Sequence, residues 1–372
     1  PAVGSFNRAF THVDSVEEVT MAYYAASQIM VFMVERFGWE KVISMMPRWA
    51  NGERTPAVVK ASLGVSTEDL DREYKAWLKK KLARYEGQFV PDLHSPPLED
   101  AEDAAKKSPK DARKLVELGI ARLRAGKGKE GQAALAEALR IDPAQPDALY
   151  VLADLALDDE KADDKTKAAA AKRHLDAMIA GKHDGYAVRM KLATIALATE
   201  DLAGARTALN AATNLDPSQP EPLMTLVKIA RKEHDERTEL ANLSKYVVLE
   251  QHDRVAWTRL LEGLVARGKW EEAAKVGEGA VYVDLANPEV HRLYARALAR
   301  TGRHVTAIYE YNSALVAGAP PEQQAEIYRE LAKGYDKLGQ PKLAEQARVF
   351  EKRVASRPPP PSKDPKAPPS RE

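Results

Sequence analysis

The stretch ARKLVELGIARLRAGKGKEGQAALAEALRIDPAQ, residues 112–145, decides the fold of this chain. Apolar residues recur at helical spacing on both sides of Gly126 and Gly128, which predicts two helices joined by a turn. The bulky, small and turn positions of the stretch are Leu115, Leu118, Gly119, Leu135, Ala138 and Pro143. One such helix pair cannot bury its apolar face alone, so we expect further copies to stack on it.

The same pattern returns at intervals of 34 residues. Later units start at Tyr186, Pro220, Arg254 and Pro288. A degenerate second unit begins near Asp147 and takes up six extra residues in the polar stretch 158–167, and a seventh unit follows after three extra residues. In the fourth unit, Glu239 stands at a position that usually takes Ala. The sequence therefore predicts a row of stacked helix pairs rather than one large core.

On these positions, residues 112–350 resemble a tetratricopeptide repeat (TPR) array. The resemblance implies an all-α fold, a right-handed α-solenoid of about six or seven helix pairs over residues 112–355. Small residues let the two helices of a pair approach closely, and large ones fill the holes of the neighbouring pair. In such arrays the first helix of each pair lines a concave groove. The resemblance therefore implies a scaffold that binds protein or peptide segments in that groove.

Two units of the expected groove carry a strip of cations. Positions 5, 9 and 13 of the first helix project on one face, and in the sixth and seventh units they are Arg292, Arg296, Arg300, Arg329, Lys333 and Lys337. The second unit has Asp154 and Asp158 there, whereas the first and third units have Val116, Ile120, Met190 and Thr194. We expect an acidic partner for the strip and an apolar groove nearer the first unit. An ordinary solvated helix face is the alternative for the strip.

Residues 1–90 differ from the repeats, since they hold three of the five Trp and five of the eight Met. Capping signals predict four helices: one to Phe37 that ends at Gly38, one from Trp39 to near Asn51, one from Thr55 to Gly64, and one after Ser66. The apolar stretch 21–34 is too short to cross a bilayer and is expected to be a buried helix. The region is therefore predicted to be a compact helical bundle.

Residues 16–85 resemble the C-terminal helical half of a peptidase MA-like (gluzincin) domain. The segments that carry this resemblance are AYYAASQIMVFMVERFG (22–38), EKV (40–42), SLGVSTEDLDREY (62–74) and KAWL (75–78). The family implies a zinc site built on H-E-x-x-H, and none of the eight His lies in such a motif. The chain itself is thus predicted to be no enzyme and to bind no metal or cofactor. The alternative is that it is the C-terminal fragment of a zinc metallopeptidase whose motif lies upstream of Pro1.

The resemblance also implies a role near such an active site for one residue of this region. The family's Tyr-Ala-Gln-Ser is here Tyr-Tyr-Ala-Ala, so the resemblance places Tyr23 at the tyrosine. The competing interpretation is a tyrosine packed within the helix bundle.

Composition excludes several classes. The 372 residues contain no Cys, which excludes disulfides, thiolate zinc sites and cysteine nucleophiles. The net charge of +1 removes a whole-protein argument for nucleic acid binding. Residues 91–111 are expected to form a linker and a capping helix. Residues 158–164 are expected to form a solvated insertion rather than a calcium loop. Residues 356–372 are expected to form a disordered Pro-rich tail. We expect no membrane span and, as a bacterial protein, a periplasmic or envelope location rather than a cytoplasmic one.

Overall fold

The computed structural model describes residue 10 and residues 16–356, and the statements below refer to them. Within this range the regular secondary structure is helical, which confirms the all-α fold class. The chain divides into two compact units, Pro1–Gln88 and Phe89–Glu372. We call the first the N-terminal bundle and the second the repeat domain. The C-terminal tail and His12 lie outside the described residues.

The described helices of the N-terminal bundle are α2 (Val16–Phe37), α3 (Trp39–Ile43), α4 (Met45–Ala50), α5 (Thr55–Leu63), α6 (Thr67–Leu82) and the short 3-10 helix η2 (Ala83–Tyr85). Two glycines end helices as predicted, since Gly38 and Gly64 have positive φ values of 87° and 80°, which favour glycine. Ser66 caps α6 by accepting a hydrogen bond from the Asp69 amide at 3.0 Å. Phe32 packs with Tyr74 and Trp77 in the core.

Two expectations for the bundle were wrong. The helix predicted from Trp39 is two helices, α3 and α4, because Pro47 has no N–H to donate back to Ile43. The apolar stretch 21–34 is helical but only one of its faces is buried, since Met21 is 65% exposed whereas Phe32 is 3% exposed. Among the described residues, none of the helices is both long and apolar enough to span a bilayer.

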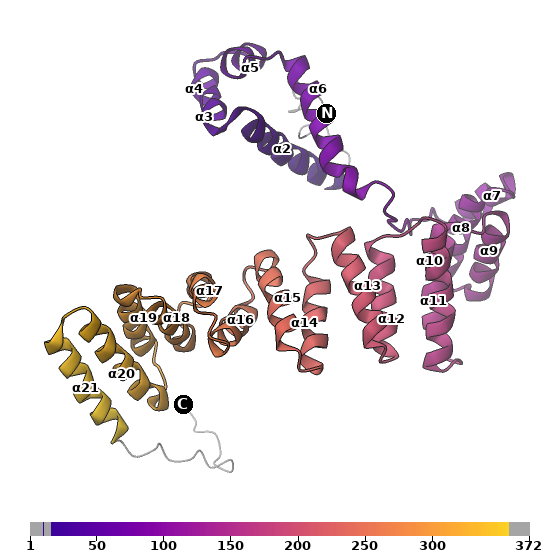
Figure 1. Cartoon of the computed structure of the whole chain (residues 1–372). Helices are drawn as coiled ribbons and strands as arrows, with labels where there is room; N and C mark the ends of the chain where they lie inside the picture. Colours follow the sequence, from indigo (N-terminus) through magenta and orange to yellow (C-terminus); the bar gives the residue numbers. More distant parts are fainter. Residues whose placement is uncertain (1–9, 11–15, 357–372) are drawn as a thin grey trace, which may run out of the picture. The chain divides into compact units, whose positions relative to one another are not determined.

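The repeat domain starts with helix α7 (Leu98–Lys107) and continues as seven helix pairs (Figure 1). We number them pair one to pair seven. They are α8 (Ala112–Arg124) with α9 (Gly128–Ile141), α10 (Pro146–Leu157) with α11 (Asp164–Ala180), α12 (Tyr186–Ala198) with α13 (Leu202–Leu215), α14 (Glu221–Lys232) with α15 (Glu236–Leu249), α16 (Arg254–Ala266) with α17 (Trp270–Val283), α18 (Pro288–Arg300) with α19 (His304–Val316), and α20 (Pro321–Lys337) with α21 (Pro341–Ala355). The two helices of a pair pack against each other, and the second packs against the first helix of the next pair.

The small residues act as the repeat pattern predicted. A Cβ on Gly119 would lie 2.8 Å from the Leu135 side chain, and one on Gly131 would lie 2.9 Å from the Gly119 carbonyl oxygen. Glycine is therefore what lets α8 and α9 approach so closely. Four second helices carry an alanine at the same position of the repeat, and each of these side chains is 0% exposed. They are Ala138, Ala212, Ala280 and Ala314.

Candidate functional site

Positions 2, 5, 9 and 13 of each first helix project on one face of that helix. We call these faces of the seven pairs, taken together, the groove face. Its apolar end was expected at Val116 and Ile120, and both are buried, with 3% and 5% exposure. The chain itself covers part of this end, because residues 89–95, of which 91–95 were expected to belong to a linker, lie against pairs one, two and three.

Phe89 is the buried anchor of this segment. Its side chain is 8% exposed and packs in a cluster with Leu149, Ala153 and Val188. Its ring centroid lies 5.7 Å from that of Tyr150, which occupies position 5 of pair two. Its amide donates a hydrogen bond of 2.7 Å to the carbonyl oxygen of Asp184, in the loop before α12. The segment therefore has one aromatic side chain inserted between pairs two and three.

Polar groups hold the rest of the segment. The Asp92 amide donates to the Asp147 carboxylate at 2.9 Å, and the Asp92 carboxylate lies 3.6 Å from the Arg113 guanidinium. Arg124 donates to the Leu93 carbonyl oxygen at 2.8 Å and to the Ser95 hydroxyl at 3.2 Å. The groove-face partners Arg113, Arg124 and Asp147 occupy positions 2 and 13 of their helices. A cleft of about 400 Å³ remains beside this segment, with Val116 in its lining.

One of the two aspartates expected on the groove face of pair two, Asp154, is neutralised by a cation. Asp154 pairs with the ammonium of Lys191, which comes from α12. The same ammonium lies 4.3 Å from the centroid of the Tyr150 ring, where a cation is favoured by the ring's negative face. Asp158 follows the last residue of α10 and caps that helix.

Pairs four and five meet at a buried carboxylate. Glu239 is 1% exposed. One of its oxygens accepts hydrogen bonds from Arg259 at 2.9 Å and from Arg231 at 3.0 Å. Its pKa is lowered, first by the hydrogen bond from Arg259 and then by that from Arg231, against the opposing effect of burial. The glutamate at the alanine position is therefore compensated by two cations from neighbouring first helices, α14 and α16.

The six predicted strip residues fall into two groups. Three of them pair with carboxylates: Arg292 with Glu289 and Glu326, Arg329 with Glu351, and Lys333 with Glu330. Arg292 is the most enclosed, with 13% of its side chain exposed, and the hydrogen bond that it donates to Glu289 raises its pKa. The pair of Arg292 with Glu326 joins α18 to α20 and the pair of Arg329 with Glu351 joins α20 to α21, whereas the pairs with Glu289 and Glu330 lie within one helix.

The other three strip residues, Arg296, Arg300 and Lys337, make no ion pair within residues 16–356. The guanidinium carbons of Arg296 and Arg300 lie 5.9 Å and 5.4 Å from the Trp270 ring centroid. Arg300, Lys333 and Lys337 line one cleft of about 240 Å³, together with the buried Tyr311. The structure thus brings three cations of the strip together, with the Glu330 carboxylate beside them.

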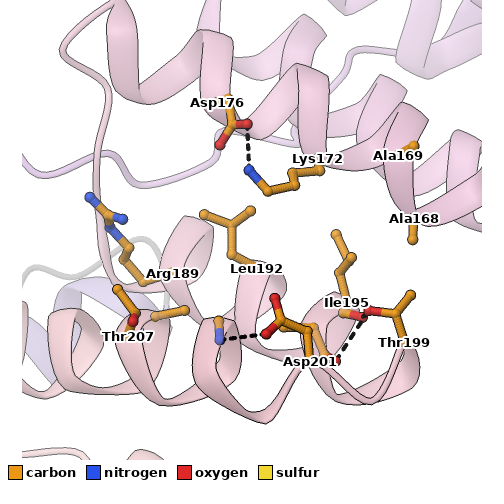
Figure 2. Close-up of a pocket in the computed structure, with 13 residues that line it drawn as sticks. Ala168, Ala169, Lys172, Asp176, Arg189, Leu192, Ile195, Thr199, Asp201 and Thr207 are labelled. Atoms are coloured by element: carbon orange, nitrogen blue, oxygen red, sulfur yellow. Dashed lines mark hydrogen bonds and ion pairs between the residues drawn. The ribbon is translucent and has the colours of Figure 1, made fainter. Parts of the chain in front are cut away.

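A further cleft of about 340 Å³ lies between α11, α12 and α13 (Figure 2). Leu192, Ile195 and Ala168 form its apolar part. Its polar groups are engaged within the protein: Lys172 pairs with Asp176 at 2.7 Å, Arg189 pairs with Asp184 at 2.6 Å, and the Asp201 carboxylate accepts from the Gly204 amide at 2.8 Å. These contacts give the cleft the character of a packing gap rather than of a reactive site.

The described residues hold no group of three or more His, Cys, Asp or Glu that could bind a metal. His291 and Glu310 are buried together, with Nδ1 of His291 2.6 Å from the Glu310 carboxylate and Nε2 2.8 Å from the Leu285 carbonyl oxygen.

Tyr23, expected within the bundle, is instead 66% exposed, with its ring 5.1 Å from that of Phe10. The exposure arises because Tyr23 lies on the solvent side of α2.

Comparisons with known proteins agree with this architecture. The tetratricopeptide repeat family model matches residues 116–170 and 259–322. These two stretches are therefore tetratricopeptide repeats, which confirms the resemblance stated above, and such repeats support a protein-interaction scaffold. No curated protein matches the chain. The peptidase MA-like resemblance of residues 16–85 stays a prediction.

Several solved structures are similar to parts of the chain. A crystal structure of MamA protein is 17% identical, covers 45% of this chain and 91% of its own, and has a TM-score of 0.34. MamA from residue 41 to its end, from Desulfovibrio magneticus RS-1, is 15% identical, with 46% and 94% covered and a TM-score of 0.33. A tetratricopeptide repeat protein from Parabacteroides merdae ATCC 43184 is 13% identical, with 66% and 93% covered and a TM-score of 0.35.

Proposed function

We propose that this tetratricopeptide repeat protein is a non-catalytic scaffold that binds peptide or protein segments along its groove face. The observation that supports this most directly is the segment 89–95, which the groove face holds through one buried aromatic ring and several backbone hydrogen bonds. Extended peptides are commonly bound in this manner, because main-chain hydrogen bonds supply affinity and side-chain pockets supply specificity.

At the other end of the groove face, we propose that pairs six and seven bind an acidic segment. Arg296, Arg300 and Lys337 supply positive charge there, and the Trp270 ring adds an apolar surface beside them. Arg292 and Arg329 contribute less, because their guanidinium groups already bind carboxylates of the protein. Charge would then set selectivity and association rate more than affinity.

Charge-reversed variants test this proposal. Labelled acidic and basic peptide libraries are titrated with the full chain and with Arg296→Glu, Arg300→Glu and Lys337→Glu. We expect acidic peptides to bind roughly tenfold more weakly to Arg300→Glu, with a loss that shrinks as salt is raised. Lys275→Glu is the matched control, since Lys275 is an exposed cation on the second helix α17. Unchanged acidic-peptide binding in all three strip variants would overturn the assignment of the strip.

A further inference from the structure

We propose that residues 89–95 are a resident ligand of the groove face, and that pairs one to three accept in its place a partner segment of the same chemistry. That partner is an extended segment with an aromatic residue followed three residues later by Asp, as Phe89 is followed by Asp92. The inference rests on the proposed function, and it adds which part of the groove is used, what it recognises and what blocks it.

One buried side chain anchors the segment, and most of its other side chains are exposed. Phe89 is 8% exposed, whereas the next residue, Val90, is 79% exposed. Most of the polar contacts use the backbone, at the Phe89 and Asp92 amides and the Leu93 carbonyl oxygen. Backbone contacts tolerate many sequences, so selectivity is left to the Phe89 ring and the Asp92 carboxylate.

Gly185 shows that the groove is shaped for this backbone. A Cβ on Gly185 would lie 2.5 Å from the Phe89 carbonyl oxygen and 2.9 Å from its amide nitrogen. The backbone of Gly185 is extended, with φ −178° and ψ 169°, a conformation that any residue adopts. Glycine at this position is therefore required by the segment and not by the fold of α12.

The contacts of the segment are also of a kind that a competitor can replace. The Arg113 and Asp92 side chains are 73% and 56% exposed, so their ion pair adds little affinity, although it still favours Asp at that place of the segment. One aromatic anchor and a few exposed hydrogen bonds remain. The segment stays in place because it is tethered, and a short tether gives an effective concentration on the order of millimolar. A free peptide of similar intrinsic affinity must compete with that concentration.

The experiment uses a labelled peptide of residues 88–97, QFVPDLHSPP, titrated with the full chain by fluorescence anisotropy. The double variant Phe89→Ala with Asp92→Ala empties the groove, and we expect it to bind the peptide on the order of 10–100-fold more tightly than the unmodified chain. Val90→Ala is the control within the segment and should bind like the unmodified chain. Adding Gly185→Ala to the double variant should return binding to the weak level, because the new Cβ occupies the place of the peptide backbone.

Two outcomes would overturn the inference: a double variant that binds no better than the unmodified chain, or a triple variant that binds as well as the double. Hydrogen exchange provides a test without substitution, since millimolar peptide should speed exchange at the Phe89 amide of the unmodified chain, and unchanged exchange would count against the inference. Acidic-peptide binding by the double variant separates the two proposals. If it persists while QFVPDLHSPP fails to bind, only the resident ligand is rejected.

Discussion

The two ends of the groove face place opposite chemistry on the same helix positions. In pair one, positions 5 and 9 are Val116 and Ile120, which are buried, and the chain's own segment lies across that end. In pair six the same positions are Arg292 and Arg296, which contact carboxylates and the Trp270 ring. The stacked pairs therefore set the spacing of the groove, whereas two or three side chains in each first helix decide which segment it binds.

The largest effects on stability should come from truncating buried core side chains at each end of the groove face. Leu135 in pair one and Leu298 in pair six are 0% and 1% exposed. Leu135→Ala and Leu298→Ala should each lower the free energy of unfolding by about 2–5 kcal/mol, because each leaves a cavity. Because each pair contacts only its neighbours, the loss of protection should be local.

Hydrogen exchange with urea unfolding checks this prediction. Leu135→Ala should expose the amides of α8 and α9 and leave those of α18 to α20 protected, and Leu298→Ala should do the reverse. Leu135→Met is the control, since it conserves volume and should cost less than about 1.5 kcal/mol. Equal loss of protection at both ends in either variant would show that the domain unfolds as one unit and that the two ends are not independent.

The second prediction concerns the joint between the two ends, where Glu239 binds Arg231 and Arg259. Glu239→Gln should lower the free energy of unfolding by about 1–3 kcal/mol at neutral pH, because it weakens charged hydrogen bonds at a buried site. The pKa of Glu239 is lowered in the folded chain from an ordinary value of 4.5. Its contribution is therefore complete above about pH 4.5 and is lost as the pH falls through the lower folded pKa.

Thermal melting of the unmodified chain and Glu239→Gln between pH 7 and pH 3 checks this sign. The gap between the two melting temperatures should be widest near neutral pH and should close in acid. Glu236→Gln is the matched control, because Glu236 lies one turn earlier on α15 and its side chain is 60% exposed in its pair with Arg267. A gap that widened towards low pH would contradict the assignment.

The helix pairs could be predicted because their determinants are local or periodic. The 34-residue spacing, the glycines of the turns and the buried alanines each act within one pair or between neighbours, so the sequence shows them directly. The split between α3 and α4 was also local, and Pro47 was the signal that was missed. Such features need no knowledge of the three-dimensional arrangement.

The resident segment could not be predicted in this way, because its contacts join residues far apart in sequence. Phe89 meets Asp184 and Tyr150 through geometry that no period encodes. The only local sign was an aromatic residue in a Pro-rich stretch. By contrast, the neutralisation of Arg292 carried a readable signal, since its partner Glu326 lies 34 residues later, one full repeat period. A search for opposite charges one period apart would have found it.

The third prediction addresses the occupied end. Phe89→Ala should lower the stability of this end by about 2 kcal/mol, less than a deep core site, because one side of the ring borders the groove. Val90→Ala should change stability by less than about 0.5 kcal/mol, since Val90 is 79% exposed. Limited proteolysis within residues 86–97 measures the difference. Cleavage at the same rate in both variants would mean that the Phe89 ring does not hold the segment.

The fourth prediction, with the smallest effect, sharpens the contrast at the basic end. Arg292→Gln should cost about 1–2 kcal/mol of stability, because the enclosed guanidinium joins α18 to α20 through Glu289 and Glu326. Arg300→Gln should cost less than about 0.5 kcal/mol, since Arg300 is exposed, yet it should weaken acidic-peptide binding more than Arg292→Gln does. Urea unfolding and peptide titration of the same two proteins give both numbers. If Arg292→Gln weakened acidic-peptide binding more than Arg300→Gln did, the partner would have to displace Glu289 and Glu326 from Arg292. The strip would then act as a whole rather than through its unpaired cations.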